Sequence, residues 1–117
     1  MDKGTAIDIA RRYSELVSEH FPAKMVVLYG SCAKETARPD SDIDVAVIVD
    51  KLDGDFLEAH TRLFRLRRDV DVRIEPVLVE ESHDRGGFLK EILSTGYVVY
   101  QASRPSEKPN SPKRMLV

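Results

Sequence analysis

The prediction of fold and function rests on residues 28–49, LYGSCAKETARPDSDIDVAVIV. An apolar run ends at Gly30-Ser31, a polar spacer follows, and a second apolar run begins around Asp42 and Asp44. Alternate side chains of a strand point to the same face, so these two aspartates are predicted to project together. Two carboxylates this close repel each other unless a cation lies between them.

Gly30 and Ser31 form the second part of the pattern. Glycine permits a tight backbone turn, and free amides at a helix start beside a hydroxyl suit a phosphate group. A divalent-metal site next to a phosphate cradle is the chemistry of nucleotide transfer. Lys34 and Arg38 could neutralise phosphate charge, and a solvated surface position is an equal alternative for each.

The composition is typical of a folded, water-soluble domain. The 117 residues suffice for one domain with a modest core, and 42% of them are hydrophobic and 32% charged. A formal net charge of −2 argues against a broad grip on nucleic acid, which is not expected as a partner. The lone cysteine, Cys32, excludes an internal disulfide. Neither a signal peptide nor a membrane span is expected, which favours a cytoplasmic location.

The apolar periodicity alternates between the helical and the extended type. Helices are predicted at residues 5–21, 55–68 and 88–95, with a short helix-compatible segment at 31–37. Strands are predicted at residues 25–29, 43–49, 70–79 and 97–100. The fold class is therefore α/β, with a small mixed sheet of about four strands and helices mainly on one face. Residues 1–100 would form this domain, and the Pro-, Ser- and Lys-rich residues 101–117 a mobile tail.

Gly30-Ser31, the spacer and Ser-Asp-Ile-Asp-Val at residues 41–45 resemble the nucleotidyltransferase signature of the DNA polymerase β superfamily. The similarity is greatest to its minimal nucleotidyltransferases, which are small single-domain prokaryotic proteins, and it extends over residues 25–100. It implies a polymerase β-like fold and transfer of a nucleoside monophosphate from a nucleoside triphosphate to a hydroxyl. The implied cofactor is Mg²⁺ or Mn²⁺, and ATP is the expected donor. The family has a second glycine shortly after the first, where this chain has Glu35.

The resemblance also assigns roles to residues. Asp42 and Asp44 would be catalytic and hold the metal ions, while Gly30, Ser31, Lys34 and Arg38 would bind the nucleotide. A third carboxylate is expected on the strand at 70–79, where Asp71-Val-Arg-Ile-Glu75-Pro matches the family pattern with its acid at Asp71. Glu75 shares the predicted face but lies ~13 Å further along an extended strand, so the two cannot hold one cation. Asp71 is the first choice for the third metal ligand, and Glu75 is the alternative.

Two classes of function remain open. The minimal family is described as the antitoxin of a toxin–antitoxin pair whose toxin is a helical HEPN-type ribonuclease. The chain would then be an enzyme that modifies a hydroxyl on such a protein partner, or a catalytically weak binding module that neutralises it. The set Asp42, Asp44 and Asp71 favours the enzyme, whereas a carboxylate at Glu35, close to a triphosphate, favours the binding module. A homo-oligomer is the alternative to a partner protein.

Overall fold

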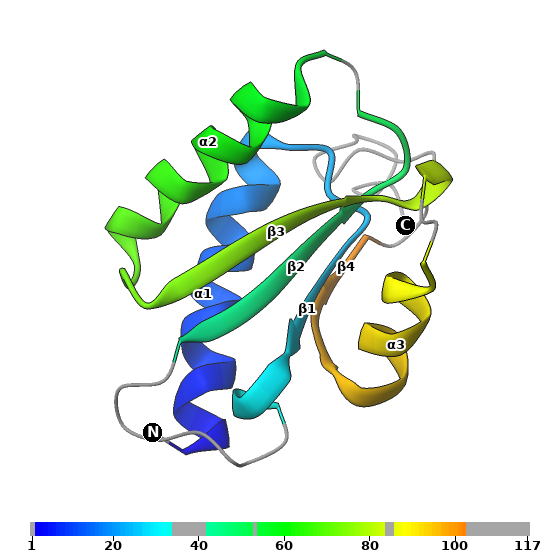
Figure 1. Ribbon diagram of the computed structural model, residues 1–117. Helices are drawn as coiled ribbons and strands as arrows, with labels where there is room; N and C mark the ends of the chain where they lie inside the picture. Colours follow the sequence, from blue (N-terminus) through cyan, green and yellow to red (C-terminus); the bar gives the residue numbers. More distant parts are fainter. Residues whose placement is uncertain (1, 34–41, 53, 84–85, 103–117) are drawn as a thin grey trace, which may run out of the picture.

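The structure is a computed structural model, and it describes residues 2–33, 42–52, 54–83 and 86–102 (Figure 1). The elements follow in the order α1 (Lys3–His20), β1 (Met25–Tyr29), the 3₁₀ turn η1 (Gly30–Cys32), β2 (Ile43–Val49), α2 (Phe56–Leu66), the 3₁₀ turn η2 (Arg67–Asp69), β3 (Ile74–Glu80), the 3₁₀ turn η3 (Glu81–His83), α3 (Phe88–Thr95) and β4 (Tyr97–Gln101). The predicted helix at 31–37 from residue 34 on, and the predicted tail from residue 103 on, lie outside the described residues.

The four strands form one mixed sheet in the order β3-β2-β1-β4. β1 runs antiparallel to both β2 and β4, whereas β2 and β3 are parallel. A parallel pair needs a crossover connection, and α2 provides it. The predicted mixed sheet of about four strands is confirmed. Pro76 lies on β3, an edge strand, as expected for a residue that cannot donate a ladder hydrogen bond.

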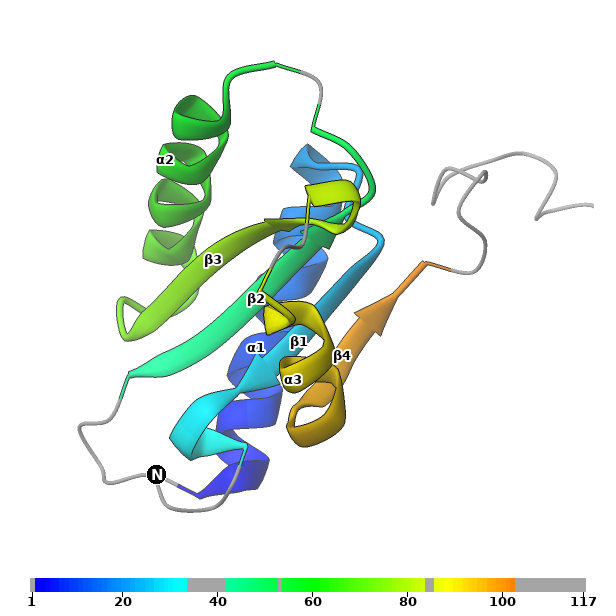
Figure 2. The same ribbon diagram turned by 45° about the vertical axis from the view of Figure 1, so that its right-hand side comes forward.

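Helices α1 and α2 cover one face of the sheet, and α3 lies on the other (Figures 1 and 2). α1 begins at its N-cap Asp2, whose carboxylate accepts a 2.7 Å hydrogen bond from the amide of Thr5. The hydroxyl of Tyr13 on α1 donates a 2.7 Å bond to the carbonyl of Leu63 on α2, which joins the two helices in the core. The expectation of helices mainly on one face is confirmed. None of the described helices has the length and apolar content to cross a membrane.

The face under α3 is covered only in part. Ile92 of α3 packs against Val27, Ala46, Ile48 and Val79 in a small second core. α3 is only eight residues long. Asp44, two residues before Ala46 on the same face of β2, is half-buried. Among the described residues, the core under α3 therefore ends before Asp44, at the start of β2.

The expectation that a strand begins at residue 70 is wrong, because β3 starts at Ile74. The amides of Val70 and Asp71 both donate to the carbonyl of Arg67, at 3.0 and 2.8 Å, so the chain is still turning after α2. Val72 is 66% exposed, whereas a core-facing strand residue would be buried. Alternation of apolar and charged residues imitated a strand where the backbone forms a turn.

Candidate functional site

The strand register brings Tyr29, Asp44 and Glu75 into one row across three strands. Tyr29 of β1 pairs with Asp44 of β2, and Asp44 pairs with Glu75 of β3. Paired residues of neighbouring strands project to the same face of a sheet. Two positions along, Val27 and Ala46 pair with each other and belong to the core under α3. The row therefore lies on the α3 face, next to the core under α3.

Asp42 lies next to this row, immediately before β2 begins. Ile43 is fully buried in the core on the opposite face, so the aspartates on either side of it project towards the α3 face. The thiol of Cys32 donates a 3.4 Å hydrogen bond to the carbonyl of Asp42, which ties η1 to the start of β2. Asp42, Asp44 and Glu75 are thereby gathered at one end of the sheet, beside η1.

The electrostatics of the row favour a cation. Burial raises the pKa of the Asp44 carboxyl, and the negative charges of Asp42 and Glu75 raise it further. Burial also raises the pKa of Tyr29, together with the charges of Asp44 and Glu75. Carboxylate oxygens are the ligands that Mg²⁺ and Mn²⁺ prefer, so the chemistry of these side chains suits such an ion. In the described part of the chain, however, three or more acidic, His or Cys side chains do not converge closely enough to hold a metal ion.

The raised pKa predicts that Asp44→Asn stabilises the metal-free protein. Above that pKa the charged carboxylate is disfavoured in the folded state, and the penalty disappears as the pH falls through it. Because Asp44 is partly exposed, solvent screening limits the gain to about 0.5 kcal/mol, or about 2 °C in Tm at pH 7. Thermal unfolding in EDTA should show this gain shrinking to nothing below about pH 4. A gain that is independent of pH would contradict the repulsion.

Gly30 closes the site on the side of β1. Its backbone has φ +74, a conformation that glycine adopts without strain. A Cβ atom at this position would collide with the carboxylate of Asp44. Glycine is thus required both by the turn into η1 and by the close approach of the backbone to Asp44. Ser31 follows within η1 and is half-buried, whereas Lys34, Glu35 and Arg38 lie outside the described residues.

The two alternatives for the third carboxylate occupy different environments. Asp71 precedes β3, and its carboxylate accepts hydrogen bonds from Arg73 Nε at 3.0 Å and Nη2 at 2.7 Å. These bonds lower the pKa of Asp71, whose side chain is 17% exposed. Glu75 lies directly across from Asp44, and its side chain is 44% exposed. The geometry therefore favours Glu75, not Asp71, as the partner of Asp42 and Asp44.

Tyr29 within the row and Arg67 beside it were not among the predicted site residues. Tyr29 lies in the row, and its ring packs edge-on against Phe88 of α3 at 5.6 Å between centroids. Its place just before Gly30, at a strand end, was the available signal. The Arg67 guanidinium lies 3.7 Å from the carboxylate of Glu75, and no spacing along the chain predicts that contact.

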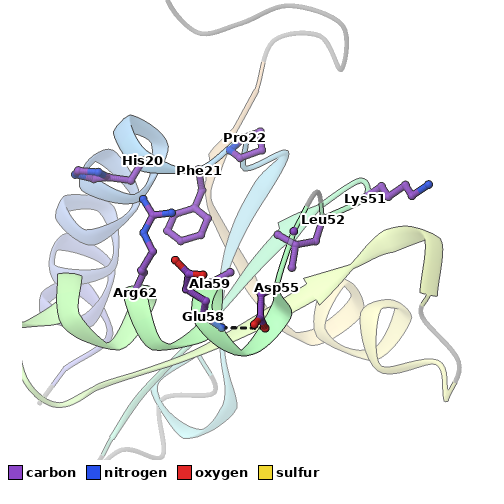
Figure 3. Close-up of a pocket in the computed structure, with 10 residues that line it drawn as sticks. His20, Phe21, Pro22, Lys51, Leu52, Asp55, Glu58, Ala59 and Arg62 are labelled. Atoms are coloured by element: carbon purple, nitrogen blue, oxygen red, sulfur yellow. Dashed lines mark hydrogen bonds between the residues drawn. The ribbon is translucent and has the colours of Figure 1, made fainter.

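A separate cavity of about 340 Å³ lies between the end of α1 and the start of α2 (Figure 3). The Arg62 guanidinium lies over the ring of Phe21 in its wall, at 4.9 Å from the centroid. The N-cap Asp55 accepts a bond from the amide of Glu58 there, so its carboxylate is engaged with α2. Lys51 and Leu52, which follow β2, also line the cavity. It thus lies at the opposite end of β2 from Asp44, and none of the predicted site residues lines it.

Comparison with known proteins identifies the family. The model of the family described as "Polymerase beta, Nucleotidyltransferase" matches residues 12–105. No curated protein sequence matches the chain. A crystal structure of a candidate nucleotidyltransferase from Sulfolobus solfataricus is similar, with a TM-score of 0.64 and 16% identity, covering 87% of this chain and 86% of that one.

Two further solved structures are toxin–antitoxin complexes. One, with AMP-PNP, has a TM-score of 0.56 and 18% identity, covering 80% of this chain and 74% of that one. The other is MntA–HpeT with two aspartates replaced by glutamate, at a TM-score of 0.53 and 17% identity, covering 79% and 72%. At these identities the likeness concerns the fold, and the family match covers most of the chain. The chain belongs to the polymerase β nucleotidyltransferase family.

Proposed function

We propose that this protein is a metal-dependent nucleotidyltransferase that moves a nucleoside monophosphate from a nucleoside triphosphate to a hydroxyl on a partner protein. AMP from ATP is the expected case. The observation that carries the proposal is the pairing of Asp44 with Glu75, beside Asp42 and close to Gly30, at the start of β2. Carboxylates collected next to a glycine turn suit a triphosphate and its cation.

Each residue of the site has a role in this proposal. Asp42 and Asp44 would hold Mg²⁺ or Mn²⁺, with Glu75 as the third carboxylate. Such a cation, when bound, favours ionisation of an attacking hydroxyl and neutralises charge on the leaving pyrophosphate. Gly30 lets the backbone of η1 approach the phosphates without a side chain in the way, and the Ser31 hydroxyl is a donor for a phosphate oxygen. Lys34 and Arg38 stay predictions as further phosphate-binding residues.

The direct test is transfer of label from α-labelled ATP. We expect labelling of a protein that co-purifies from the native host, dependent on Mg²⁺ or Mn²⁺. Asp42→Asn and Asp44→Asn should each lower the rate by at least about a hundredfold and remove the metal dependence of nucleotide binding. Asp50→Asn is the matched control, because Asp50 is exposed and follows the far end of β2. Equal nucleotide binding with and without metal, in wild type and variants alike, would contradict the proposal.

A second candidate is a binding module that acts as an antitoxin and neutralises a HEPN-type toxin with little or no catalysis. The specific observation in its favour is that two similar solved structures are toxin–antitoxin complexes. Co-expression with the co-purifying protein separates the candidates. If Asp42→Asn and Asp44→Asn still relieve its toxicity, binding suffices, and if they do not, catalysis is required. A homo-oligomer without a second protein would favour neither partner model.

A cytoplasmic location is part of the proposal. ATP, the expected donor, is a cytoplasmic metabolite, and the lone cysteine is present as a buried free thiol. A free thiol fits a reducing compartment.

A further inference from the structure

Arg67 connects α2 to the row of Tyr29, Asp44 and Glu75. It opens the turn η2, which follows α2 directly and leads into β3 (Figure 1). Its Nη1 atom donates a 2.9 Å hydrogen bond to the carbonyl of Ile74 and lies 3.7 Å from Oε1 of Glu75. The guanidinium therefore stands at the start of β3, between the backbone of the strand and the carboxylate that faces Asp44.

The position of Arg67 is fixed by two contacts that do not involve Glu75. The amide of Ile43 on β2 donates to the carbonyl of Arg73, at 2.8 Å, so the carbonyl of the next residue, Ile74, faces the outer edge of the sheet. Among the described strands β3 pairs with β2 alone, and Arg67 satisfies this edge carbonyl. The guanidinium also lies over the ring of Phe64, 4.9 Å from its centroid. Arg67 is thus held in place whether or not Glu75 stays beside it.

Glu75, in contrast, can move. Its side chain is 44% exposed, and no hydrogen bond of its carboxylate is described. Arg67 attracts it, while Asp44 across the strand repels it. The other neighbouring arginine, Arg73, is engaged by the two carboxylate oxygens of Asp71. With Glu75 beside Arg67, three acidic side chains do not converge in the described part of the chain.

We propose that Arg67 is a positioning residue that holds the carboxylate of Glu75 aside from Asp42 and Asp44 until a divalent cation binds there. The inference rests on the proposed function, since it takes Glu75 as the third carboxylate. A cation between the aspartates offers Glu75 twice the charge of Arg67 and reverses the repulsion from Asp44. Arg67, bonded to Ile74 and Phe64, stays behind. Its positive charge thereby weakens metal binding, and in the metal-free protein it reduces the repulsion between the carboxylates of Glu75 and Asp44.

The expected result is that Arg67→Gln binds Mn²⁺ about three- to tenfold more tightly than the wild type, because a positive charge close to the site is gone. Arg68→Gln is the matched control: it removes the same charge from the same turn, and Arg68 is exposed. Arg67→Lys keeps the positive charge but loses the planar group that binds Ile74 over Phe64. Its Mn²⁺ affinity should lie between that of the wild type and that of Arg67→Gln.

The measurement is a titration of the full chain with Mn²⁺ alone, followed by the electron paramagnetic resonance signal of the free ion. A double-mutant cycle of Arg67→Gln and Glu75→Gln, unfolded by urea in EDTA, tests the pair without metal and should show favourable coupling. If Arg67→Gln and Arg68→Gln bind Mn²⁺ equally well and the wild type also binds it, the role of Arg67 is refuted and the proposed function is not affected. A wild type that binds no Mn²⁺ would refute the proposed function and the inference with it.

Discussion

Glu75→Gln is expected to lower kcat for nucleotide transfer by at least about a hundredfold, whereas Asp71→Asn leaves most of the rate. Glu75 lies directly across from Asp44, and its amide replacement keeps the shape of the side chain while removing its charge. The carboxylate of Asp71 is already engaged by Arg73 and precedes β3. Losing it costs an ion pair at the margin of the site, not a metal ligand.

Steady-state transfer from α-labelled ATP at saturating Mg²⁺ distinguishes the two variants. Glu91→Gln serves as the control, since Glu91 lies on the exposed side of α3. Thermal unfolding should be measured for each protein, because Asp71→Asn also loosens the turn before β3. The reverse ranking, with Asp71→Asn inactive and Glu75→Gln active, would show that Asp71 moves into the site when nucleotide binds.

Gly30→Ala is expected to abolish activity and to lower the free energy of unfolding by about 1–3 kcal/mol. Two costs add at this position. The left-handed backbone, with φ +74, is unfavourable for alanine. The added methyl group would also meet the carboxylate of Asp44, which must then leave its place in the row. The first cost affects stability, and the second displaces Asp44, the proposed metal ligand.

Gly87→Ala separates these two costs. Gly87 has nearly the same backbone angle, φ +73, but no atom within 4 Å of an added Cβ. Urea unfolding should show the smaller loss for Gly87→Ala, and metal-dependent binding of ATP should survive only in that variant. Equal losses in the two proteins, with ATP binding retained in both, would mean that Gly30 serves the turn alone.

The paired aspartates could be predicted because strand alternation is a local property. Ile43 is buried and its two neighbours project to the opposite face, as the period of two requires. The third carboxylate could not be chosen in the same way. Asp71 and Glu75 both fit an alternating pattern, and only the hydrogen bond from the amide of Asp71 to Arg67 shows that one of them lies in a turn.

Local sequence patterns predicted some features of the arrangement of helices and strands, but not those that depend on contacts between distant segments. The helix at 88–95 and the edge position of Pro76 follow from periodicity and from the missing amide of proline. The face that α3 covers, and the alignment of Glu75 with Asp44, depend on how far the α2 crossover shifts β3 along β2. No residue pattern encodes that shift. The effect of Glu35 on a triphosphate stays a prediction, because that residue lies outside the described part.

The strand order has a consequence for how the chain acquires its structure during synthesis. The whole row of Tyr29, Asp44 and Glu75 has left the ribosome once β3 has emerged, since β1 and β2 precede it. The outer edge of β1 waits longer, because its partner is β4, and Met25 pairs with Gln101. Such distant pairing forms slowly, and an unpaired edge invites association with other chains. The nascent protein can therefore assemble the end of the sheet with Asp44 and Glu75 first, and it is most prone to aggregate before β4 emerges.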